Sequence, residues 1–198
     1  MHTLPSLALA LLAAFSLNAC VSSIKPKTTP LDLYDFGLQA ATRPVDFSLP
    51  VESLSAMDAI QHSNIRYRLN YKNPSQVFVY AESRWASPPV ELLRQKLATT
   101  PSSHAGCSLK LYITAFDHVF DDANSSHGVV QLQASLMDKR SRKPLASTLV
   151  SAQSPASGTD ARGGVAALDA ASTEALQSAS RWASVTSAAA SECQPSNP

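Results

Sequence analysis

The sequence lacks a strong charge of either sign, and it lacks the short motifs that mark several enzyme classes. Its 198 residues hold 16 lysines and arginines against 15 aspartates and glutamates, so electrostatic attraction gives it no preference for nucleic acid or an anionic lipid surface. It contains no Gly-x-Ser-x-Gly elbow, no phosphate-binding loop and no Gly-x-Gly-x-x-Gly turn. We therefore expect no catalytic residue and no cofactor, and a binding or assembly role rather than an enzyme.

Long hydrophobic runs are also missing, apart from a short one near the amino terminus. An uncharged apolar stretch begins at Leu4 and stops at Cys20, too short to span a bilayer as a stable anchor. It ends in the residues LNAC (17–20), and a small residue before a cysteine at this place is typical of a bacterial lipoprotein signal peptide. We expect residues 1–19 to be removed and Cys20 to be lipidated. The alternatives are an ordinary secretory signal or a buried amino-terminal helix.

The residues that follow Cys20 predict where the domain lies. The pattern resembles that of enterobacterial lipoproteins, in which an aspartate directly after the cysteine retains the protein in the inner membrane. This chain has Val21 at that position, so outer-membrane delivery is favoured. Residues 20–30 hold two prolines and no apolar periodicity, which predicts a lipidated tether. We expect one periplasmic domain over residues 31–190 and a carboxyl-terminal tail over 191–198.

Cysteine is scarce, since only Cys107 and Cys193 remain once Cys20 is acylated. An even number of cysteines in an oxidising compartment is compatible with a disulfide. This bridge would tie the carboxyl-terminal tail to the start of a central strand, and the loop-entropy model gives it on the order of 4 kcal/mol of stabilisation. Two unpaired thiols are the alternative.

Alternation of apolar and polar residues predicts strands along most of the domain. Short turns join consecutive strands into a hairpin in the first half and an antiparallel meander in the second. The predicted strands cover residues 31–37, 45–54, 65–69, 76–80, 108–116, 129–137 and 145–152.

Two helices complete the predicted fold. Ser87 followed by two prolines indicates a capped helix start, and this helix should run to about Ala98. Residues 165–190 repeat apolar side chains at intervals of three and four, which predicts a long alanine-rich helix entered through a flexible pair, Gly163 and Gly164. We predict an α+β fold in which two main helices pack on one face of a mostly antiparallel sheet.

Several potential metal ligands are present but are not spaced like a metal-binding motif. Most of them fall in predicted turns or on the polar side of a strand. We interpret them as solvated residues and expect no metal site. They are His104, Cys107, His118 and His127, with Asp117, Asp121 and Asp122.

Arg84 and Trp85 form the most distinctive local feature, at the corner between a predicted strand and the first helix. A tryptophan at such a corner is commonly a core residue, with the arginine packed over it. The alternative is that Tyr67, Tyr80 and Trp85 border an apolar groove for a lipid or a partner segment.

Together with the signal peptide, four segments resemble the ABC-type transport auxiliary lipoproteins. That family includes the paraquat-inducible protein C lipoproteins and the lipoproteins encoded beside MCE-domain lipid transporters. The Arg-Trp-x-x-Pro-Pro segment is the most specific part, and the resemblance covers most of the mature chain. The matching segments are YDFG (34–37), IRYR (65–68), YAESRWASPP (80–89) and ELL (91–93).

The resemblance implies a non-enzymatic lipoprotein that is anchored in the outer membrane and faces the periplasm. Its partners would be an inner-membrane ATPase, a permease and an MCE-domain protein, and together they would move phospholipid or other hydrophobic molecules. The family has no agreed catalytic residues, so none is assigned here. We expect Tyr67, Tyr80, Arg84 and Trp85 to form a structural or partner-facing cluster. A structural or assembly lipoprotein of another envelope or secretion complex is the rival interpretation.

Overall fold

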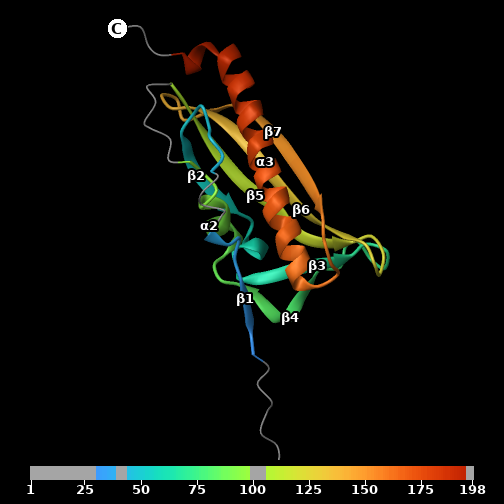
Figure 1. Cartoon of the computed structure of the whole chain (residues 1–198). Coiled ribbons are helices and arrows are strands. Elements are labelled where there is room, and N and C mark those ends of the chain that lie inside the picture. Colours follow the sequence, from blue (N-terminus) through green and yellow to red (C-terminus); the bar gives the residue numbers. More distant parts are fainter. Residues whose placement is uncertain (1–29, 39–43, 99–105, 195–198) are drawn as a thin grey trace, which may run out of the picture. The chain divides into compact units, whose positions relative to one another are not determined.

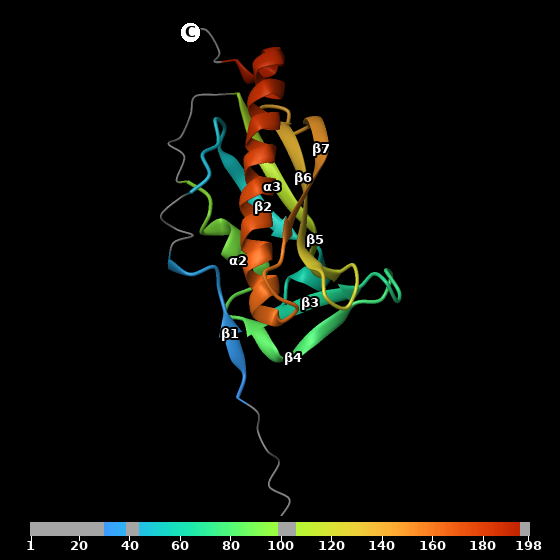
Figure 2. The same ribbon diagram turned by 45° about the vertical axis from the view of Figure 1, so that its right-hand side comes forward.

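The computed structural model describes residues 30–38, 44–98 and 106–194, and the chain divides into two compact units, Met1–Pro30 and Leu31–Pro198. The described part of the second unit holds seven strands in one sheet, with a single long helix across one face (Figures 1 and 2). The elements in chain order are β1 (Asp32–Tyr34), β2 (Val51–Ala56), η2 (Asp58–Ile60), β3 (Asn64–Leu69), β4 (Phe78–Trp85), α2 (Pro89–Arg94), β5 (Cys107–Phe120), β6 (Ser126–Asp138), β7 (Pro144–Pro155), α3 (Ala161–Ala189) and η3 (Ser191–Cys193).

Strand β5 is the centre of the sheet. On one side it pairs antiparallel with β6, which in turn pairs antiparallel with β7. On its other side it pairs with two strands in succession, β2 along its first half and β3 at its end, both parallel. The main path of the sheet is therefore β1-β4-β3-β5-β6-β7, with β2 beside β5.

The sheet is mixed, so the prediction of a mostly antiparallel sheet was wrong. Three pairings are parallel, β1 with β4 and both β2 and β3 with β5, and they equal in number the antiparallel pairings of the described strands. The predicted hairpin between β3 and β4 and the meander from β5 to β7 are confirmed. Local turns fix these antiparallel neighbours, whereas the alternating pattern is the same for a parallel and an antiparallel strand.

The prediction of two main helices was also wrong, because α2 has only six residues. Its N-cap residue is Pro88, with no side-chain capping bond, so Ser87 does not cap it. After Gln95 the chain leaves the helix, and Leu97 forms a parallel bridge with Val45. Tertiary pairing of the backbone thus ends a helix that the local pattern would continue to Ala98.

Helix α3 covers one face of β5, β6 and β7 (Figure 2). Its seam toward the sheet consists largely of small residues, so the helix lies close to the strands. Gly128 of β6 is beneath the helix, where a Cβ atom would be 2.6 Å from the Ala167 carbonyl carbon. Gly163 and Gly164 lie inside α3 rather than in a flexible entry to it, and the amide of Gly163 donates to the N-cap Asp160.

One covalent link just beyond the carboxyl-terminal end of α3 and one group of polar contacts in its first half fix the helix. The predicted disulfide is confirmed: Cys107 at the start of β5 is bonded to Cys193, just beyond α3. Lys96, beyond the end of α2, is buried; it forms an ion pair with Asp169 and donates to the Thr173 hydroxyl at 2.9 Å. Both links hold α3 against the rest of the domain.

Candidate functional site

Two adjacent residues of β5 occupy the centres of two polar clusters on opposite faces of the sheet. Successive side chains of a strand point to opposite faces. Asp117 therefore belongs to the open face, and His118 belongs to the face covered by α3. Both side chains are almost fully buried, with exposed fractions of 2% and 0%. Each is held by residues from other strands.

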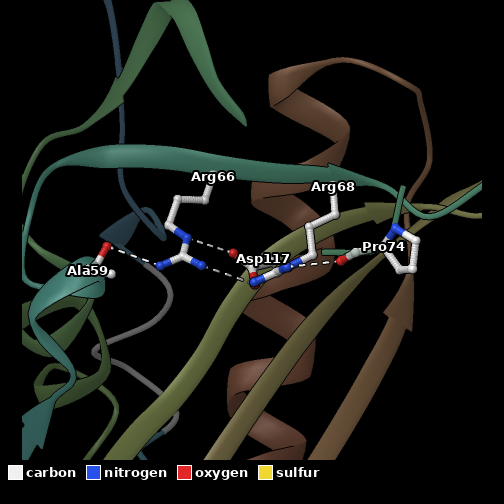
Figure 3. Close-up of polar contacts among 5 residues, drawn as sticks. All are labelled: Ala59, Arg66, Arg68, Pro74 and Asp117. Carbon is white, nitrogen blue, oxygen red and sulfur yellow. Dashed lines mark hydrogen bonds and ion pairs between the residues drawn. The ribbon is translucent and has the colours of Figure 1, made fainter. Parts of the chain in front are cut away.

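Asp117 lies between two arginines of β3, Arg66 and Arg68 (Figure 3). The Nε atoms of Arg66 and Arg68 donate to separate oxygens of the carboxylate, each at 2.8 Å. Arg66 also donates to the carbonyl of Ala59 at 3.1 Å, and Arg68 to that of Pro74 at 3.1 Å. Through these two arginines, the Asp117 carboxylate links β5 to β3, to η2 and to the β3–β4 turn.

The charge of this cluster is not balanced, because two guanidinium groups share one carboxylate. Arg66 is buried, while the Arg68 side chain keeps 25% of its surface exposed. Removal of water from a charge is costly unless a partner of opposite sign replaces it. The ion pairs of Asp117 with Arg66 and Arg68 consequently stabilise the fold. The partly exposed guanidinium of Arg68 leaves a positive charge on the open face, the face not covered by α3.

His118 is the middle of a chain of hydrogen bonds beneath the start of α3. Its Nδ1 is 2.8 Å from the Tyr80 hydroxyl, and its Nε2 is 2.8 Å from the Ser126 hydroxyl. The Ser126 hydroxyl donates to the carbonyl of Gly158 at 3.4 Å. Gly164 fits over the imidazole ring, where a Cβ atom would be 2.4 Å from Nδ1.

The proton positions follow from this chain. The Ser126 hydroxyl donates its proton to the Gly158 carbonyl, so its oxygen is left to accept a hydrogen bond from His118. We therefore assign the proton of His118 to Nε2, and Nδ1 accepts from the Tyr80 hydroxyl. Burial, aided by the charge of His127, lowers the pKa of His118 to about 4. Burial likewise raises the pKa of Tyr80, so its hydroxyl keeps the proton that it donates. In this arrangement the chain of hydrogen bonds joins β4, β5 and β6 through Tyr80, His118 and Ser126.

Sequence reasoning treated Asp117 and His118 as solvated residues, and this was wrong. Their partners are 38 to 51 residues away along the chain, except for Ser126. One signal was available: Arg66 and Arg68 alternate with apolar residues, which places both guanidinium groups on one face of a strand. Nothing local indicates that Asp117 lies opposite them.

The predicted cluster of Tyr67, Tyr80, Arg84 and Trp85 is divided among three places. Trp85 is 2% exposed and packs in the core at 5.8 Å from the Phe36 ring. The Tyr67 and Tyr80 rings are 4.8 Å apart, beside His118. Arg84 turns back along its own strand, and its guanidinium donates to the carbonyl of Ser83 at 2.8 Å.

A second candidate surface is the β6–β7 turn, whose residues 139–143 (KRSRK) include four cations. Asp138 holds this turn by accepting from the Ser141 hydroxyl and from the backbone amides of Arg140 and Ser141, and these hydrogen bonds lower the pKa of Asp138. The turn borders a cleft of about 640 Å³, whose lining carries both signs of charge. The lining residues are Pro50, Glu52, Ser108, Lys110, Met137, Asp138, Lys139 and Arg142.

Other predicted positions fall outside these surfaces. Cys20, the predicted lipidation site, and His104 lie outside the described residues. Within residues 30–38, 44–98 and 106–194, no group of three histidine, cysteine or acidic side chains is arranged to hold a metal. No helix in the described part of the chain has the length and apolar character needed to cross a membrane.

Comparison with known proteins finds similarity in structure and none in sequence. No family model and no curated protein sequence matches this chain. A Xanthomonas campestris protein of the DUF330 family superimposes with a TM-score of 0.62 at 20% identity, over 79% of this chain and 97% of that one. An uncharacterised protein gives 0.55 at 14% identity, over 79% and 99%. The likeness shows the fold alone. A Neisseria meningitidis lipoprotein, at 15% identity over 60% and 89%, has a TM-score of 0.28, too low to carry an argument.

Proposed function

We propose that this protein is a lipid-anchored lipoprotein of the outer membrane whose periplasmic domain is an accessory, non-catalytic component of a transport system. In this proposal it works with an ABC-type permease and ATPase and an MCE-domain protein, and the system moves phospholipid or other hydrophobic molecules. The observation that carries the anchor is Cys20, at the end of an uncharged apolar leader and ahead of a short tether.

The position of the first strand supports a tethered domain. β1 begins at Asp32, and the residues from Cys20 to Asp32 extend at most about 40 Å. The domain would therefore stay near the membrane that holds the lipid. Acyl chains on Cys20 would hold it there firmly, because each buried CH₂ contributes roughly 0.8 kcal/mol.

The two polar clusters support a role without catalysis. The Asp117 carboxylate is occupied by Arg66 and Arg68, and the imidazole of His118 is occupied on both nitrogens. A general acid or base must be free to meet a substrate proton. These groups are instead used to hold strands and helix together.

Metabolic labelling of the full chain with palmitate tests the anchor. Wild type should carry the label, and Cys20→Ala should lose it. The double variant Cys107→Ala, Cys193→Ala is the matched control, because it removes the other two cysteines and should keep the label. A wild-type protein without label would contradict the anchor.

Cross-linking in cells, followed by mass spectrometry of the purified complex, tests the transport role. Recovery of permease, ATPase and MCE-domain subunits together with the palmitate-labelled protein from the outer-membrane fraction would support it. A labelled protein that recovers a different envelope or secretion complex would contradict it and favour the assembly alternative.

A further inference from the structure

The outer edge of β7 is long and has no neighbour among the described residues. The strand pairs with β6 along its length, and the main path of the sheet ends there. Natural proteins usually protect such edges with charged residues, prolines or bulges. The 12-residue strand β7 has no charged residue, has proline only at its two ends, and shows an irregular register only beside Pro144. An edge of this kind is a template for another strand.

The opposite end of the sheet does not offer a matching edge. β1 has only three residues, so pairing β7 of one copy with β1 of the next would use a small fraction of β7. Pairing β7 with β7 of a second copy uses nearly the whole strand in each copy. Such self-complementary pairing also produces a closed, twofold assembly.

The charges along β6 and β7 favour the antiparallel arrangement that a twofold axis imposes. The cationic turn 139–143 lies at one end of these strands, and the acidic residues Asp121 and Asp122 lie in the β5–β6 turn at the other end. Antiparallel pairing brings the cationic end of each copy beside the acidic end of its partner. Parallel pairing would bring like charges together.

We propose that two copies of this chain pair β7 with β7 in an antiparallel manner and form one continuous sheet. A twofold axis perpendicular to the sheet keeps both α3 helices on the same side and pairs residues of the same face. The register centred on Leu149 places this side chain, which is 61% exposed, beside its counterpart. Ser147 then lies opposite Ser151. This interface is independent of the lipid anchor and of the transport role.

Disulfide cross-linking of the full chain in membranes tests the contact directly. Leu149→Cys should give a covalent dimer on a non-reducing gel. Val185→Cys is the matched control, because Val185 is 74% exposed and belongs to α3 rather than to the strand proposed to pair. Absence of a dimer band for Leu149→Cys, or an equal band for both variants, would overturn the proposal.

Charge exchange at the same position gives a second test, on protein purified in detergent. Leu149→Lys alone and Leu149→Glu alone should each weaken dimer formation by about tenfold or more, because like charges would lie directly opposite each other. Mixing the two variants should restore the dimer. At concentrations low enough to keep all three proteins monomeric, both variants should have the unfolding midpoint of wild type, since the side chain is exposed.

A mixture of the two variants that stays monomeric would overturn the proposal, and so would either of two observations on the wild-type protein. One is a wild-type protein of monomer mass at the concentrations at which it occurs in the membrane. The other is a wild-type protein that binds an extended segment of a different protein along β7 in place of a second copy. Loss of lipidation in Cys20→Ala would leave the cross-link of Leu149→Cys unchanged, so failure of the anchor is distinguishable from failure of this interface.

Discussion

The two faces of the sheet are stabilised in different ways, although the same strand contributes to both. On the covered face, α3 approaches β5 and β6 over glycines and small side chains, and the polar residue His118 is held neutral. On the open face, Asp117 is bound by two arginines. The covered face therefore depends on close fit, and the open face depends on charge pairing. Four predictions test this difference, in order of decreasing change in stability.

Removal of the disulfide should have the largest effect, and it acts on the covered face. Cys107→Ala with Cys193→Ala should lower the free energy of unfolding by about 4 kcal/mol, because the bridge closes a long loop in the unfolded chain; the two cysteines are 86 residues apart. Denaturant unfolding measures the change. Wild type under reducing conditions is the control and should match the variant. A change below about 1 kcal/mol would show that α3 is held without the bridge.

Removal of Asp117 should have the largest effect on the open face. Asp117→Ala should lower the free energy of unfolding by about 3 kcal/mol, because it leaves the buried guanidinium of Arg66 without a counter-charge. Asp121→Ala is the control: this carboxylate pairs with His127 at 2.8 Å but is half exposed, and its loss should cost less than about 0.5 kcal/mol. Equal effects of the two substitutions would contradict the proposed importance of charge pairing on the open face.

The pH dependence of stability should report on His118. Its pKa in the folded protein, about 4, lies below the ordinary histidine pKa of 6.5, so the unfolded chain binds a proton more readily. The stabilisation is complete above pH 6.5 and is lost as the pH falls toward 4, with about 2 kcal/mol lost by pH 5. Urea unfolding at pH 8 and pH 5 measures this loss. His118→Gln should remove most of the difference, and an unchanged pH dependence in this variant would assign it to other groups.

Crowding beneath α3 should give the smallest effect. Gly128→Ala should lower the free energy of unfolding by about 1.5 kcal/mol, because the added methyl group meets the backbone of the helix, with Cβ only 2.6 Å from the Leu168 amide nitrogen. Gly158→Ala is the control, since its Cβ would be 3.5 Å from the nearest atom outside its chain neighbours. Thermal unfolding compares them. An undiminished stability of Gly128→Ala would mean that the helix moves away at little cost.

The strands of the second half could be predicted from the sequence, as could their antiparallel neighbours. Their alternation is regular, and the turns between them are short, so each strand has one nearby partner. The same reasoning failed in the first half, where β1 pairs with β4 and β2 with β5 in parallel. These partners are separated by long connections, for which an alternating pattern carries no information.

The candidate site shows the same limit at the level of single residues. The pairing of Cys107 with Cys193 was open to prediction because few cysteines are present. The pairing of Asp117 with Arg66 and Arg68 was not, because many charged residues were available as partners. The interpretation of Trp85 as a core residue was confirmed by its burial and by its packing against Phe36, because a large aromatic side chain next to a strand end has few other places to go.

Periodicity along the chain was enough to predict most of the strands, the place of the long helix and which side chains share a face, although the strand predicted at 45–54 lies at Val51–Ala56. The parallel pairing of β2 and β3 with β5, the end of α2 at Arg94, and the burial of Asp117 and His118 on opposite faces are visible only in the folded structure. The difference lies in the range over which the interactions act. Backbone propensity acts over a few residues, whereas burial, charge pairing and strand pairing depend on groups that meet only after the chain has folded.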